Sequence, residues 1–321
     1  MSSKKVTKYV VLFFCFIALS YGQEDFNFVS PGLQGAYKIP LKSALLNNYI
    51  MPDSLREKAD SSYKSEGINY PVFCSLIAAT GVTIYLINDY YQHSWWKDNR
   101  TSFKVVNDWN YALWFDKMGH FYATDYLSFA FNTALWASNF SPEQSVWYGS
   151  IAALTFQLYV EVQDGFGPQW GFSPGDATAD LLGATYPVLQ FYYPRLNDFQ
   201  PRFSYYPSEE YLSGEKEDGN IVDDYGGQKM WLSVRIKNYL PKTIAKYWPS
   251  FLMLAVGYSV SNHQSSGYVD NQIYLAFDLD TEALPLHGKG WDFVKKTFSF
   301  IHFPLPGLRI SPRLSFKLFT Y

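Results

Sequence analysis

The sequence predicts a mainly α protein, an apolar and membrane-associated helical bundle followed by a small antiparallel β region. Long runs without a charged side chain recur in the first part of the chain, and period-two alternation of apolar and polar residues marks the last part. Aromatic residues make up 20% of the 321 residues, which suits a protein at a membrane interface. The formal net charge of −3 provides no basic field, so nucleic acid is not an expected partner.

Residues 1–22 are predicted to be a signal peptide. Three lysines precede a short apolar core, and small residues precede a cleavage position after Gly22. An uncleaved anchor helix is the alternative, but the apolar core is short for a membrane span. Cys15 lies inside this core without the sequence context of a lipid-attachment site. After cleavage Cys74 is the one cysteine left, so no internal disulfide is expected.

The helical bundle is predicted over residues 67–197, after a polar region with short helices over 23–66. A short helix is expected after Asp53 in that polar region. Four uncharged runs indicate the bundle helices: 67–88, 126–142, 144–160 and 181–194. The first, of 22 residues, is long enough to cross a bilayer, whereas the two middle runs of 17 are borderline. The runs are therefore either short spans or core helices of a bundle at the membrane surface.

The β-rich region is predicted over residues 231–321, after an acidic linker over 198–230. The acids of this linker lack the spacing of a calcium-binding EF-hand loop, so a solvated linker is preferred. Beyond it, apolar and polar residues alternate as expected for half-buried strands. The segments are 232–236, 273–279 and 314–318, with 251–260 as a fourth candidate.

Ionisable residues gather inside the most apolar part of the chain, where an unpaired charge costs several kcal/mol or more. They form three pairs whose spacing of three or four residues places both members on one helix face. The pairs are Asp116 with His120, Glu161 with Asp164, and Asp176 with Asp180. Because the pairs lie near helix ends, we expect them to meet at one level of the bundle. A capping box beginning at Ser141 predicts the tight turn between the two middle helices.

These residues divide into two sets by expected role. The candidates for acid–base catalysis and for binding a divalent metal are His120, Glu161, Asp164 and Asp180. The residues expected to be structural or to supply a counter-charge are Asp116, Lys117 and Asp176, with Asp176 closing a capping box. A network of ion pairs that orients the helices is preferred over a reactive site.

The pattern Gly171-x-Ser173-x-Gly175 matches the nucleophile elbow of hydrolases, but we interpret it as a helix cap. The elbow needs the backbone N–H after the serine as a donor, and Pro174 has none.

Three motifs taken together resemble the YfiM-like family of predicted periplasmic lipoproteins. They are D-K-x-x-H-F, a Glu and an Asp three residues apart, and G-F-S-P-G-D-A-T-A-D-L-L-G-A. The resemblance spans about residues 109–190. It implies placement in the cell envelope and puts the family's polar positions on the residues named above. A looser similarity links the same motifs to VanZ-like membrane proteins. The chain departs from the lipoprotein pattern in lacking an obvious lipid-attachment motif and in adding a β-rich tail.

Three functions remain open for an exported cell-envelope protein with membrane lipid as its expected partner. The preferred one is a structural or interaction module whose polar residues hold the helices together. The second is an envelope hydrolase that uses a metal or acid–base site on lipid or cell-wall material. The third is a transport accessory, since ionisable residues inside a membrane mark transport pathways.

Overall fold

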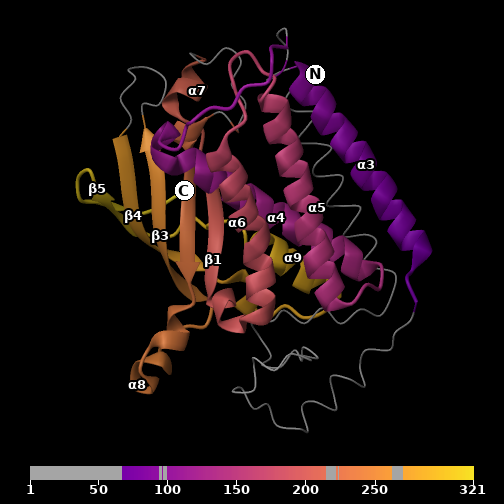
Figure 1. Ribbon diagram of the computed structural model, residues 1–321. Coiled ribbons are helices and arrows are strands. Elements are labelled where there is room, and N and C mark those ends of the chain that lie inside the picture. The colour runs from indigo at the N-terminus through magenta and orange to yellow at the C-terminus, as the bar shows by residue number, and fades with distance from the viewer. Residues whose placement is uncertain (1–66, 94–95, 97–99, 215–221, 223, 262–269) are drawn as a thin grey trace.

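The structure is a computed structural model that describes residues 67–321 except 94–95, 97–99, 215–221, 223 and 262–269. A layer of helices packs beside a curled antiparallel sheet (Figure 1). The predicted fold class, a helical bundle followed by an antiparallel β region, is confirmed. The predicted signal peptide, the region 23–66 and its helix after Asp53 lie outside the described residues.

The bundle consists of four long helices. They are α3 (Tyr70–His93), α4 (Phe115–Ala137), α5 (Pro142–Asp164) and α6 (Pro174–Tyr192). Ser141 caps α5 in the expected capping box with Gln144, so the chain reverses tightly after α4. In the described part of the chain, α3 alone is long and apolar enough to cross a membrane, and only 6% of its most apolar window is buried.

The two middle runs form the cores of α4 and α5, whose backbones approach each other closely. A Cβ at Gly149 of α5 would lie 2.6 Å from the backbone N of Asn132 on α4. A Cβ at Gly183 of α6 would lie 2.3 Å from the carbonyl oxygen of Phe121, also on α4. Glycine is therefore required at both crossings, and α4 is held between α5 and α6.

The sheet of the described region has six strands, each antiparallel to the next, in the order of the sequence. They are β1 (Phe199–Tyr205), β2 (Gln228–Val234), β3 (Leu252–Ser261), β4 (Asp270–Leu279), β5 (Gly307–Ser311) and β6 (Ser315–Lys317). Among the described residues, the short helices are α7 (Glu209–Ser213), α8 (Lys242–Ala245) and α9 (Lys289–Phe298). The 3-10 turns are η1 (Tyr111–Trp114), η2 (Pro194–Asp198), η3 (Tyr225–Gly227), η4 (Ile236–Tyr239) and η5 (Thr281–Ala283).

The range 198–230, expected to be an acidic linker, contains strand β1, helix α7 and the start of β2. The pattern of β1 conceals the strand, because its buried side chains are the polar Gln200, Arg202 and Ser204. Pro201 also argues against a paired strand in the sequence, although β1 pairs with β2 along its whole length. The strand expected over 232–236 ends at Val234 and is followed by the turn η4.

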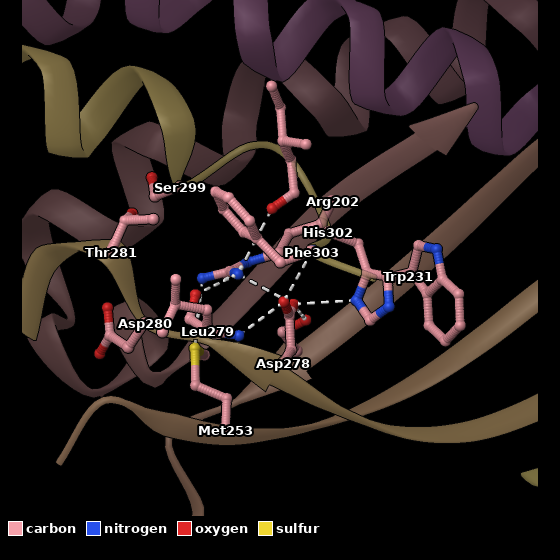
Figure 2. A network of polar contacts seen from close by, with 12 residues as sticks. Arg202, Trp231, Met253, Asp278, Leu279, Asp280, Thr281, Ser299, His302 and Phe303 are labelled. Carbon is pink, nitrogen blue, oxygen red and sulfur yellow. Dashed lines mark hydrogen bonds and ion pairs between the residues drawn. The ribbon is translucent and has the colours of Figure 1, made fainter. Parts of the chain in front are cut away.

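The interior of the β region is polar and is organised around Asp278 (Figure 2). The guanidinium group of Arg202 donates a hydrogen bond of 2.8 Å to Asp278, which also accepts from Ser233. His302 Nδ1 lies 3.1 Å from the same carboxylate, and its ring stacks on Trp231. Burial raises the pKa of Asp278, but the hydrogen bonds and charges of His302 and Arg202 outweigh it, so the net pKa is lowered. A buried ion-pair network therefore lies beside the apolar cluster of Trp231, Ala255, Tyr274 and Ala276 on this face of the sheet.

The start of α4 joins the two layers. Phe115 is 1% exposed and packs with Met230 of β2 and Val260 of β3. The hydroxyl group of Tyr258, also on β3, donates to the carbonyl oxygen of Leu113 just before the helix. These contacts fix the first turns of α4, which carry the polar residues Asp116, Lys117 and His120.

Two glycine substitutions on facing helices are expected to have opposite effects on stability. Gly183→Ala should lower the free energy of unfolding by about 1–3 kcal/mol, because the new methyl group meets the backbone of α4. Gly119→Ala should raise it by about 0.5–1 kcal/mol, because a Cβ there has only Met230 Cε, at 3.8 Å, nearby. Urea unfolding of both variants measures the difference. Equal effects would contradict the close approach of α4 and α6.

Candidate functional site

The polar residues of α4, α5 and α6 meet around the imidazole ring of His120. Its Nδ1 atom lies 3.2 Å from Asp180 Oδ1 and 3.7 Å from Glu161 Oε1. Its Nε2 atom lies 4.0 Å from Asp176 Oδ1 on the other side of the ring. The expected convergence of the three helices is therefore present in the structure. We call His120, Glu161 and Asp180 the His120 group.

Asp180 is fully buried, and its two carboxylate oxygens differ in their partners. Besides His120, Oδ1 accepts a hydrogen bond of 2.8 Å from the Thr124 hydroxyl and a longer one from the Gln157 amide. The buried Oδ2 atom has no hydrogen-bond partner among the described residues. An unpartnered buried carboxylate oxygen is costly, so its position needs an explanation.

Lys117 lies beside the His120 group and is 5% exposed. Its Nζ atom lies 3.0 Å from Asp108, 3.1 Å from Asp116 and 2.9 Å from Asp176. These four residues form the Lys117 cluster. Tyr225 of η3 donates to Asp116 at 2.6 Å, which links the cluster to the β region. Lys117 thus supplies the counter-charge that the sequence predicts, to three carboxylates rather than one.

Asp176 differs from its expected role as a capping residue. Ser173 caps α6, since its Oγ atom accepts a hydrogen bond from the backbone N–H of Asp176. The Asp176 side chain faces Lys117 instead of closing a capping box. The Ser173 hydroxyl also donates to Asp108, so the cap joins helix α6 to the loop before α4. This arrangement agrees with the interpretation of Ser173 as a cap.

Asp164 lies at the edge of the site. Its Oδ1 atom accepts a hydrogen bond of 2.6 Å from the indole N–H of Trp96. Burial raises the pKa of Asp164 to about 6, although this hydrogen bond and the charge of His120 lower it. Asp164 lies outside the two sets of residues whose ligand atoms converge. Of the four residues expected to bind metal, the structure therefore brings three together.

Burial and charge shift the pKa values of the central groups in opposite directions. Burial lowers the pKa of His120, but the hydrogen bond to Asp180 and the nearby carboxylates raise it to about 10. Burial raises the pKa of Glu161 to about 8, although the charge of His120 opposes this. Burial also raises the pKa of Asp116, but His120 and Lys117 outweigh it, so the net pKa is lowered. The site therefore favours a protonated imidazole and leaves Glu161 short of positive charge.

Two overlapping sets of side chains could hold a metal ion. In each set the ligand atoms lie within 4.8 Å of one another. One is the His120 group, and the other consists of Asp116, His120 and Asp176. Lys117 occupies the second set, since it contacts both carboxylates. The His120 group is therefore the better candidate, with one imidazole and two carboxylates from three different helices.

Three residues of the site were not predicted from the sequence: Asp108, Thr124 and Gln157. Thr124 follows His120 by four residues, and Gln157 precedes Glu161 by four. The same helical spacing that identified the other pairs could have found them. Asp108 lies in the loop before η1, and no local pattern connects it to Lys117.

Residues 106–192 match the model of a family described as "predicted periplasmic lipoprotein (DUF2279)". The match covers α4, α5, α6 and the polar site, and leaves the sheet outside it. No curated protein and no solved structure matches the chain. The resemblance inferred from the motifs is confirmed, whereas the looser likeness to VanZ-like proteins has no support. The protein is exported and associated with the cell envelope.

The Lys117 cluster leads to a prediction about stability. Lys117→Met should lower the free energy of unfolding by about 3–5 kcal/mol, because three carboxylates lose their shared cation. Lys104→Met is the matched control, since the Lys104 ammonium group donates to the neutral carbonyl of Pro168. Urea unfolding at neutral pH compares the two variants. A loss in Lys117→Met no larger than that in Lys104→Met would show that the cluster is not stabilising.

Proposed function

We propose that the helical bundle of this exported envelope protein binds a divalent cation through His120, Glu161 and Asp180. The observation that carries the proposal is the convergence of their ligand atoms within 4.8 Å from three helices. One imidazole nitrogen with carboxylate oxygens suits zinc, manganese or iron(II) better than calcium. The cation would tie α4, α5 and α6 together, which is the structural role that the sequence favours.

The charge balance of the site supports a cation. The ion pairs around Lys117 and His120 include five carboxylates, Asp108, Asp116, Glu161, Asp176 and Asp180. Lys117 is shared by three of them, so His120 is left as the cation nearest to Glu161 and Asp180. Burial raises the pKa of Glu161, and the charge of His120 offsets this only in part. A divalent ion would supply the missing charge and displace the proton from the imidazole ring.

The partner arrangement of Asp180 gives a second line of support. Thr124 and Gln157 fix the carboxylate through Oδ1, whereas the buried Oδ2 is left without a hydrogen-bond partner among the described residues. Around metal sites, neighbouring groups usually hold a metal-binding carboxylate in place through hydrogen bonds to its other oxygen. If the network bound no ion, the buried Oδ2 atom would stay without a partner, at a free-energy cost.

Metal analysis of the purified protein tests the proposal. We expect about one equivalent of zinc or manganese in the protein, and its loss in His120→Ala and Asp180→Asn. Asp164→Asn is the control, since this carboxylate bonds to Trp96 and lies outside the converging set. At a metal concentration of about 100 Kd, the ion should add about 2.7 kcal/mol to the free energy of unfolding.

The alternative outcomes of this experiment are distinct. A wild-type protein that binds no metal, and whose melting temperature does not change when zinc or manganese is added, would contradict the proposal. Equal metal loss in Asp164→Asn and Asp180→Asn would place the ion elsewhere in the site. Circular dichroism of each variant checks that metal loss is not a consequence of unfolding.

A second candidate function is hydrolysis of lipid or cell-wall material. Two features favour it: the small number of metal ligands, and access of substrate to the site, since the His120 side chain is 22% exposed. Catalytic zinc sites combine three protein ligands with one open position, at which a bound water is activated. The residues present would hold the ion and leave that position to water.

This candidate predicts metal-dependent turnover. The metal-loaded protein should release product from phospholipid vesicles or from purified peptidoglycan, and removal of the metal should abolish the reaction. Asp180→Asn should reduce the rate by at least about a hundredfold, a typical cost of perturbing metal-site residues. A metal-loaded, folded protein that is inactive on both substrates would leave the structural role as the function of the ion.

A further inference from the structure

One face of the sheet is covered by the start of α4 at Met230 and Val260. Next to that contact, this outer face carries a continuous row of exposed apolar side chains. The register of the strands places one such residue on each of five adjacent strands, directly opposite the next. This apolar row consists of Leu232, Val256, Leu275, Leu308 and Phe316. Their exposed fractions run from 39% to 67%. Ile273 and Phe277 of β4 extend the row on both sides, with 38% and 40% exposed.

The outer face is apolar and uncharged, whereas the buried face mixes apolar side chains with a polar network. The strand residues next to the row point to the opposite face, where Ser233, Ala255 and Ala276 are buried. That buried face also contains Arg202 and Asp278, both fully enclosed (Figure 2). From β2 to β6, no strand position on the outer face carries a charged residue. Sheets in water normally bury the apolar face and expose the polar one.

The connection between β2 and β3 lies at one end of this face and has a composition of its own. Residues 235–251 contain α8, which projects from the end of the sheet (Figure 1). From 236 onward the segment has three lysines and no acidic residue: Lys237, Lys242 and Lys246. Tyr247 is 78% exposed, and Lys246 lies over its ring. Exposed aromatic rings and lysines beside an apolar band are typical of the boundary between hydrocarbon and lipid headgroups.

We propose that the apolar row binds the surface of an anionic bilayer, with Lys242 and Lys246 contacting the phosphate groups of the lipids. Charge complementarity selects this occupant. The apolar row supplies burial in the acyl region, and the lysines of the acid-free connection supply attraction to negative headgroups. The inference is independent of the metal site, which lies among the helices.

A fluorescent probe at a single position tests this surface in the full chain. In a background with Cys15→Ser and Cys74→Ser, an environment-sensitive dye is attached at Leu275→Cys. Vesicles of phosphatidylcholine with phosphatidylglycerol should shift its emission to the blue, and spin-labelled acyl chains should quench it. The same dye at Leu182→Cys on α6, which is 57% exposed, is the matched control and should respond less. The comparison distinguishes lipid contact by the sheet from lipid contact by α3.

The charge contribution is tested with a pair of reversals. Lys242→Glu with Lys246→Glu should weaken binding of the dye-labelled protein to anionic vesicles at least about tenfold. Arg100→Glu with Lys104→Glu reverses two cations of the segment between α3 and α4, on the helical side, and should change binding much less. Vesicles of phosphatidylcholine alone should bind both pairs equally.

Three outcomes would overturn the proposal. If the dye at Leu275→Cys is unaffected by anionic vesicles, the row does not meet lipid. If its emission is already blue in the absence of vesicles, protein covers the row, and dependence on protein concentration would identify a second copy. If the two reversal pairs weaken binding equally, the lysines of the β2–β3 connection do not direct it.

Discussion

The burial of Lys117 among three carboxylates is the interaction on which the geometry of the bundle depends. Its partners come from the loop before α4, from α4 itself and from α6. Removing a lysine and several carboxylates from water costs several kcal/mol per ion, which is offset only when the geometry is close to ideal. The interaction therefore specifies one arrangement of α4 and α6 rather than simply adding stability. Phe115, packed on the sheet two residues earlier, fixes the same helix from the other side.

Because Lys117 is fully engaged, the charge of the neighbouring group is left unbalanced. His120 faces Glu161 and Asp180 on one side and Asp176 on the other. One imidazole cannot neutralise all of these acids. Asp180 and the nearby carboxylates raise the pKa of His120, while burial raises the pKa of Glu161 despite the charge of His120. The proposed cation follows from this imbalance. A network meant only to orient helices would be expected to match its charges, as the Arg202–Asp278 network of the sheet does.

The sequence predicted what depends on local spacing and missed what depends on distant pairing. The capping box at Ser141 and the face shared by Asp116 and His120 follow from contacts within four residues, so they can be inferred from the chain itself. The contact of Asp108 with Lys117 and the strand β1 have no such local signal. β1 turns polar residues inward, and Arg202 among them pairs with Asp278 of β4, 76 residues later in the chain. Asp164 had the right spacing, but Trp96 holds its carboxylate at the edge of the site.

The two parts of the chain share one physical arrangement. Each holds a buried polar network, around His120 in the bundle and around Asp278 in the sheet. Apolar side chains also lie outside, as with Leu275 on β4 and Phe316 on β6. In water such an arrangement exposes apolar surface at a free-energy cost proportional to its area. Beside a bilayer that cost disappears, so the proposed contact with lipid would account for the exposed apolar row.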